Sequence, residues 1–140
     1  MTLYTYLPPD QDQVRLIRLL AAVSWDKQLQ ISLFPASLSD PDRQDHQALS
    51  YVWGDPQQTI GIVVNNDYVL EITTDLTDLL RQLRRDDSDR ILWVDAISIN
   101  QKDNNEKSHQ VGRMDEIYRR ASFVVAWRGT DYWMKTRSSE

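Results

Sequence analysis

Residues 92–111, LWVDAISINQKDNNEKSHQV, place four polar side chains where a hydrophobic strand stops. Asp95 follows the apolar run LWV directly, and Asn100 and Gln101 stand in the polar loop beyond it. Glu106 lies in the first turn of an expected helix. Carboxylates and amides in this position suit ligand binding and carboxylate-assisted chemistry, since open α/β sheets bind ligands at the carboxyl ends of their strands.

The same residues also have structural interpretations, which stay open. Glu106 comes three positions after Asp103, the spacing of a capping box that secures a helix N-terminus. Asp95 could bond the loop amides of residues 97–99, and the two amide side chains could only tie down their loop. A loop fixed in this way would still shape a pocket.

Composition favours one soluble domain over residues 1–140, long enough for a hydrophobic core. The absence of cysteine excludes disulfides and thiolate chemistry. His46 and His109 are far apart in sequence, so no metal site is expected. A net charge of −5 argues against a nucleic-acid polymer as partner, because phosphate binding needs a concentrated basic surface.

No apolar run approaches the roughly 20 residues that a membrane span requires. The start, MTLYTYLPPDQDQ, lacks the basic and apolar regions of a secretory signal. We therefore expect no membrane span and a cytoplasmic location.

Hydrophobic periodicity predicts an α/β fold. The leucines of residues 73–85 recur at helical spacing and form one apolar face, with Thr73 or Thr74 as the cap. A hairpin is expected around Asn65-Asn66-Asp67, because Asn and Asp tolerate positive φ. Strands are expected at 14–20, 28–34, 48–55, 59–64, 68–72, 91–95 and 122–127, and a second helix at 104–120 with Val111, Met114, Ile117, Tyr118 and Ala121 on its inner side.

The alternation of helix and buried strand in the C-terminal half is typical of a parallel sheet. We predict that 91–95 and 123–127 are neighbouring parallel strands joined through the 104–120 helix. The N-terminal third is β-rich and is expected to add antiparallel strands.

Three ordered blocks resemble the fungal heterokaryon incompatibility (HET) domain: ALSYVWGD (48–55), LWVDAISINQKDNNEKSHQVGRMDEIYRRA (92–121) and FVVAWRG (123–129). The core of the resemblance covers about 48–129. Ser98 departs from the family pattern, which usually has cysteine there.

This resemblance implies an effector of programmed cell death in fungal incompatibility and innate immunity, with a core similar to that of Toll/interleukin-1 receptor (TIR) domains. Many TIR domains cleave nicotinamide from NAD+ with a glutamate, whereas others only assemble signalling complexes. The implied ligand is NAD+ or a related nucleotide as substrate, with no cofactor. The alternative is a non-catalytic module that acts by self-association or with a receptor-type partner.

Under the enzymatic interpretation, a carboxylate stabilises the positive charge that develops on the ribose as the N-glycosidic bond breaks. Trp53 and Trp93 are either core residues or an aromatic wall for the ligand. Ser50 and Tyr51 point to opposite sides of one strand, so only one of them faces the core. The expected catalytic residues are Glu106 and Asp95, and the expected ligand-binding residues are Ser50, Tyr51, Trp53, Gly54, Asp55, Asn100 and Gln101. We expect Asp95, Glu106 and the 50–55 strand end to meet in one cleft.

Overall fold

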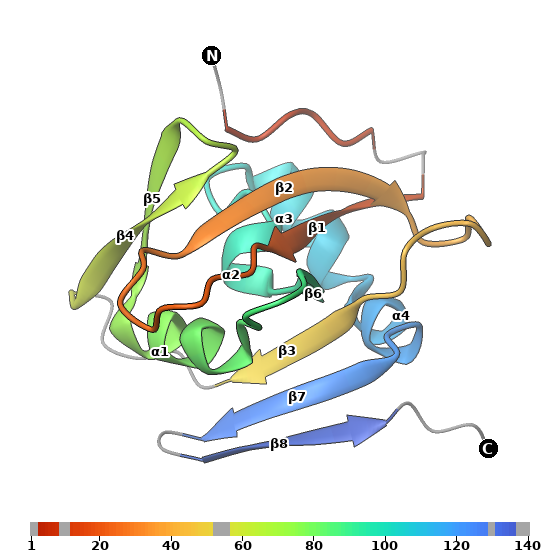
Figure 1. The fold of residues 1–140 in the computed structure, drawn as a ribbon. Helices are drawn as coiled ribbons and strands as arrows, with labels where there is room; N and C mark the ends of the chain where they lie inside the picture. The colour runs from red at the N-terminus through yellow and green to blue at the C-terminus, as the bar shows by residue number, and fades with distance from the viewer. Residues whose placement is uncertain (1–2, 9–11, 52–56, 129–130, 137–140) are drawn as a thin grey trace.

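The computed structural model describes residues 3–8, 12–51, 57–128 and 131–136. Within these residues it contains a single mixed sheet with helices packed against it (Figure 1). The strands are β1 (Gln13–Leu19), β2 (Gln30–Ser37), β3 (Gln47–Tyr51), β4 (Thr59–Val64), β5 (Tyr68–Thr73), β6 (Arg90–Trp93), β7 (Phe123–Arg128) and β8 (Asp131–Thr136). The helices are α1 (Thr74–Leu83), α2 (Asp95–Ser98), α3 (Asn104–Val111) and α4 (Met114–Arg119).

The eight strands follow the order β5-β4-β2-β1-β6-β3-β7-β8. β3 pairs in parallel with both β6 and β7, which confirms that the last two run in the same direction. β1 pairs antiparallel with β2 and with β6, as expected for the N-terminal third. The predicted α/β class is therefore confirmed.

The prediction that β6 and β7 are neighbours is wrong, because β3 lies between them. A further parallel pair joins β2 and β4. Numbered along the chain, the three strands β6, β3 and β7 have the order second, first, third, which is the order of flavodoxin-like doubly wound sheets. In such sheets the ligand binds at the carboxyl ends of the first and third strands, where the direction of winding reverses. Here these strands are β3 and β7.

Helix α1 and the β4–β5 hairpin form as local sequence predicts. The hydroxyl of Thr73 accepts a hydrogen bond from the backbone N–H of Leu76, and the leucines of the apolar face are buried. Asn65 and Asn66 have φ values of 52° and 76°, the positive angles that the turn needs.

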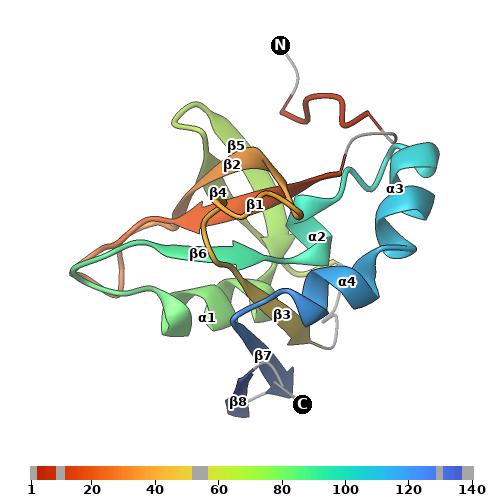
Figure 2. The same cartoon turned by 90° about the vertical axis from the view of Figure 1, so that its right-hand side faces the viewer.

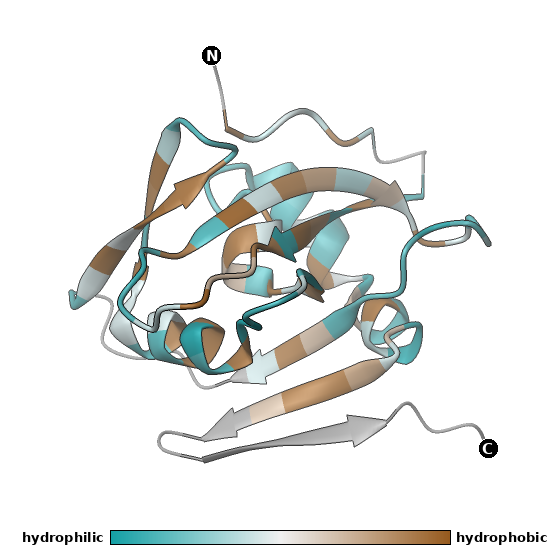
Figure 3. Ribbon diagram, in the orientation of Figure 1, coloured by the Kyte–Doolittle hydropathy of each residue, from teal (hydrophilic) through white to brown (hydrophobic). Residues whose placement is uncertain are grey.

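Two hydrophobic clusters lie on opposite faces of the sheet, because side chains alternate along each strand. Leu92 and Val94 join the cluster that includes α1, whereas Trp93 joins the cluster that includes Ile117 of α4. Figure 2 shows these two helices apart on either side of the central strands. The strands at the sheet centre are mostly hydrophobic and the segment after β2 is hydrophilic (Figure 3).

The single helix expected at 104–120 is divided into α3 and α4 around Gly112 and Arg113. The break shifts the helical phase. Val111, expected inside, is therefore 50% exposed, whereas Gln110 is buried and donates its amide hydrogen to the carbonyl of Gln13. Ile117 and Ala121 are buried as predicted.

Candidate functional site

Asp95 lies at the carboxyl end of the parallel strands, where the sequence predicts a site. It is the first residue of α2 and lies two positions beyond Trp93, which is paired with Ala48 of β3. Ser50 lies two positions beyond Ala48 and its side chain is exposed. Both residues therefore belong to the same edge of the sheet.

The environment of Asp95 makes its charge costly. The side chain is half-buried, and burial raises the pKa of Asp95 despite the opposing effects of the Ala96 N–H and the Lys107 ammonium. Tyr118 of α4 donates its hydroxyl hydrogen to the carbonyl of Leu49, at 2.9 Å. Burial, with a smaller effect of the Asp95 charge, raises the pKa of Tyr118 to about 12, so the phenol stays protonated at neutral pH.

Side chains bind the backbone of the segment from Val94 to Gln101, which carries Asp95. The amide of Gln101 donates to the carbonyls of Asp95 at 2.8 Å and Ile99 at 3.4 Å. The side-chain oxygen of Asn100 accepts from the N–H of Lys102. The amide groups of Asn100 and Gln101 therefore fix this loop, as their structural interpretation predicts.

Ser98 also serves the backbone of this segment. Its side chain is buried, and its Oγ accepts the N–H of Val94 at 3.1 Å. The hydroxyl thus satisfies a buried backbone donor at the point where β6 gives way to α2.

Glu106 forms a buried ion pair with Arg15 of β1. Its Oε2 lies 2.6 Å from Nη1 of Arg15 and its Oε1 lies 2.8 Å from Nη2. The side chains of Arg15 and Glu106 are only 2% and 7% exposed. Oε2 of Glu106 also accepts the backbone N–H of Asn100 at 2.7 Å. Both carboxylate oxygens are therefore engaged within the protein.

The capping box predicted for α3 is half formed. Asp103 is the N-cap, and its carboxylate accepts the N–H groups of Asn105 and Glu106. The second bond of the box, from the N–H of Asp103 to the Glu106 carboxylate, is not formed, because that N–H donates to the carbonyl of Asn100. The guanidinium of Arg15 is a stronger partner for the carboxylate than a backbone N–H, because both groups are charged.

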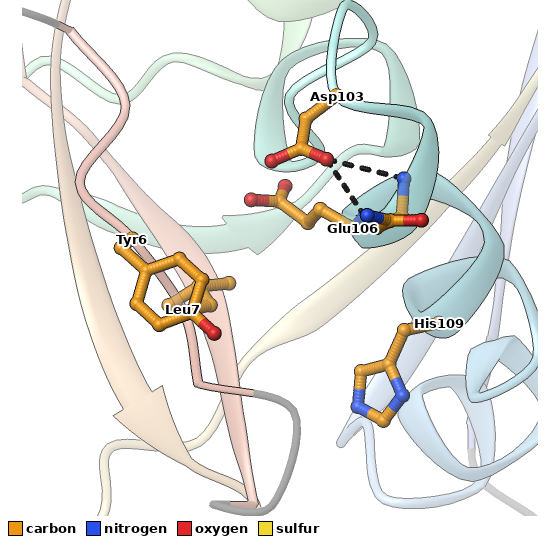
Figure 4. A pocket seen from close by; sticks show the side chains of 6 residues that line it. Tyr6, Leu7, Asp103, Glu106 and His109 are labelled. Carbon is orange, nitrogen blue, oxygen red and sulfur yellow. Dashed lines mark hydrogen bonds between the residues drawn. The ribbon is translucent and has the colours of Figure 1, made fainter.

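A cavity of about 300 Å³ lies between α3 and the N-terminal segment (Figure 4). Asp95 does not line it, so the two carboxylates expected in one cleft do not share this one. The described lining residues are Tyr6, Leu7, Asp103, Asn105, Glu106 and His109.

Several predicted ligand-binding positions fall outside the described structure. Trp53, Gly54 and Asp55 lie in the segment between β3 and β4 that is not described, and the same holds for the side chain of Tyr51. Trp93 is fully buried and packs edge-to-face against Tyr118, with ring centroids 5.8 Å apart. Trp93 is therefore a core residue and not a ligand wall.

Sequence reasoning missed Arg15 and Tyr4. The Tyr4 ring lies 4.9 Å from the guanidinium carbon of Arg15, and its hydroxyl donates to the carbonyl of Ile97. The available signal was an arginine inside the apolar strand VRLIRLL, because a charge buried in a sheet needs a partner. The partner itself, 91 residues away, could not be read from local patterns.

Over the described ranges, no group of three or more histidine or carboxylate side chains could hold a metal ion. Among the same residues, no helix has the length and hydrophobicity of a membrane span.

The order of the strands β6, β3 and β7, with helices on both faces, defines a doubly wound α/β domain, a class in which ligands bind at strand ends. The family model for heterokaryon incompatibility protein (HET) matches residues 46–139, and the chain belongs to this family. It is 39% identical over 128 residues to heterokaryon incompatibility protein 6, OR allele, of Neurospora crassa. That match covers 83% of the chain and 18% of the relative's length. No solved structure matches the chain significantly.

Proposed function

We propose that this chain is a HET-type effector of fungal incompatibility that cleaves the N-glycosidic bond of NAD+ or a related nucleotide. The supporting observation is the state of Asp95. It is a half-buried carboxylate of raised pKa at the carboxyl end of β6, beside β3, which is one of the two strands where the winding reverses. Burial has deprived the Asp95 carboxylate of part of its hydration, and a ligand cation beside it would restore part of that stabilisation.

The proposed reaction is a hydrolysis. The bond between ribose C1′ and nicotinamide N1 breaks, and its electron pair goes to the nitrogen, so that nicotinamide leaves as a neutral base. The positive charge that develops on the ribose is stabilised by the carboxylate of Asp95. Water then adds to C1′ and loses a proton, which gives ADP-ribose. The leaving group needs no general acid, because the pyridinium already carries the charge.

Asp95 is a better candidate than Glu106 for this role. Glu106 already faces the positive charge of Arg15 through two hydrogen bonds, and a third bond comes from the N–H of Asn100. A carboxylate neutralised in this way contributes little to a second cation. In the proposed mechanism Ser50 contributes ligand contacts from the end of β3.

The alternative is a module that acts by self-association without catalysis. The observation that favours it is the open form of the sheet, in which β5 and β8 are the outermost strands of the described part. An outer strand offers backbone groups to which a second chain can add a strand.

Free nicotinamide, measured by chromatography after incubation of the purified chain with NAD+, separates the two functions. Catalysis predicts release in proportion to time and protein, at a rate per chain that does not depend on protein concentration. The self-association alternative predicts no release at any concentration, together with oligomers in light scattering.

A further inference from the structure

The segment from Val94 to Gln101 is held on its inner side by contacts that converge on one buried guanidinium. Nη1 of Arg15 lies 3.4 Å from the carbonyl of Ser98, and Nη2 donates to the carbonyl of Thr5. The two nitrogens also bind the carboxylate of Glu106. Arg15 thus joins β1, the N-terminal segment, the 94–101 segment and α3.

Glu106 links Arg15 to the Asn100–Gln101 turn of the same segment. Its Oε2 accepts the N–H of Asn100 at 2.7 Å, directly before Gln101, whose amide binds the carbonyl of Asp95. The chain of bonds therefore runs from Arg15 through Glu106 and the Asn100–Gln101 turn to the backbone of Asp95.

The N-terminal segment covers the same assembly. The Tyr4 hydroxyl donates to the carbonyl of Ile97 at 2.8 Å, and its ring lies over the guanidinium of Arg15. Side chains bind the backbone of six of the eight residues from Val94 to Gln101 in the hydrogen bonds described: Val94, Asp95, Ile97, Ser98, Ile99 and Asn100. A four-residue helix such as α2 has little stability of its own, so these bonds fix its geometry.

A buried ion pair is a weak device for stability, because the desolvation of both charges offsets their attraction. The pair instead offers directional bonds that fix one conformation. We propose that Arg15 is a positioning residue, whose ion pair with Glu106 holds the 94–101 segment so that the Asp95 carboxylate faces the strand-end site. This inference rests on the function proposed above, and it assigns Glu106 to positioning rather than to contact with the substrate.

The test replaces the whole pair by apolar residues of similar size, Arg15→Met with Glu106→Leu. Such replacements of buried ion pairs are often neutral or stabilising, so the double variant is expected to fold. It removes the donor to the Ser98 carbonyl and the acceptor of the Asn100 N–H. The control is Glu116→Leu with Arg120→Met, which removes a partly exposed i,i+4 ion pair between α4 and its C-cap residue.

Two readouts do not depend on catalysis. Hydrogen exchange of the Asn100 amide should accelerate at least tenfold in the Arg15/Glu106 variant. The carboxyl carbon of Asp95, followed by NMR titration, should show its pKa falling toward the ordinary aspartate range as water reaches the loosened segment. Lys107, whose ammonium also lowers the pKa of Asp95, is unchanged in both variants. The control should leave both readouts at their wild-type values.

NAD+ cleavage is the third readout, and a fall in kcat of tenfold or more is expected for the Arg15/Glu106 variant. A folded variant with unchanged Asn100 exchange and unchanged Asp95 titration would overturn the inference and leave the pair a structural one. Absence of nicotinamide release by the wild-type chain would instead remove the proposed function, and the two NMR readouts would then decide separately whether the pair positions Asp95.

Discussion

Glu106→Gln distinguishes a helix cap from the partner of a buried charge. A glutamine oxygen in the place of Oε2 can still accept from Nη1 of Arg15 and from the N–H of Asn100, but the NH₂ group then faces Nη2 of Arg15, donor against donor. The substitution also leaves the Arg15 charge uncompensated in a site that is 2% exposed. Breaking a buried pair in this way costs about 3–5 kcal/mol, whereas the loss of a capping interaction alone costs under about 1 kcal/mol.

Urea denaturation measures the difference. With a slope of about 2 kcal/mol/M, which is usual for a small domain, the midpoint should fall by roughly 2 M. The matched control is Asp103→Asn at the N-cap of the same helix, where asparagine caps about as well as aspartate and the cost should stay within about 1 kcal/mol. A Glu106→Gln midpoint equal to that of the Asp103→Asn control would refute the assignment of Glu106 to a buried ion pair.

The remaining predictions concern pH and the hairpin. Burial lowers the pKa of His46 below its usual 6.5, and the neutral ring binds the Ile117 carbonyl through Nε2. As the pH falls, His46 is therefore protonated in the unfolded chain before it is protonated in the folded one. Its contribution to the free energy of unfolding is complete above about pH 6.5 and declines as the pH falls below that value. In His46→Gln the urea midpoint should therefore change less between pH 7.5 and pH 5.5 than in the wild type. An equal change in both proteins would contradict this cause. Asn66, at φ 76°, should accept glycine with little change or a gain in melting temperature, whereas Asn66→Val should lower it; equal melting temperatures would show that the turn is not constrained.

Local elements of the fold were predictable because their signals are local. The leucines of α1 recur at helical spacing, Thr73 can cap only the helix that follows it, and the two asparagines tolerate positive φ. The apolar runs of β6 and β7 indicated parallel strands, and the structure confirms their common direction, since both pair in parallel with β3. Each of these predictions depends on residues within one helix, one strand or one turn.

The errors arose where distant segments meet. The insertion of β3 between β6 and β7 depends on the packing of the whole sheet and not on either strand. The burial of Gln110 in place of Val111 follows from the break at Gly112, which a continuous helical period hides.

At the candidate site, sequence spacing located Asp95 at a strand end and Glu106 near a helix N-terminus, and both positions are confirmed. Sequence spacing could not reveal that Arg15 forms an ion pair with the Glu106 carboxylate, since the two residues are far apart in the chain. The catalytic assignments of both carboxylates stay predictions.

The rate of nicotinamide release by Asp95→Asn tests the central claim most directly. Asparagine keeps the size of the side chain and removes the charge that would oppose the developing cation, so cleavage of NAD+ should fall by at least a hundredfold. The control, Asp78→Asn, changes an exposed carboxylate of α1 and should leave the rate unchanged. Full activity of a folded Asp95→Asn variant, or equal losses in both variants, would contradict the assignment of the reaction to the strand-end carboxylate.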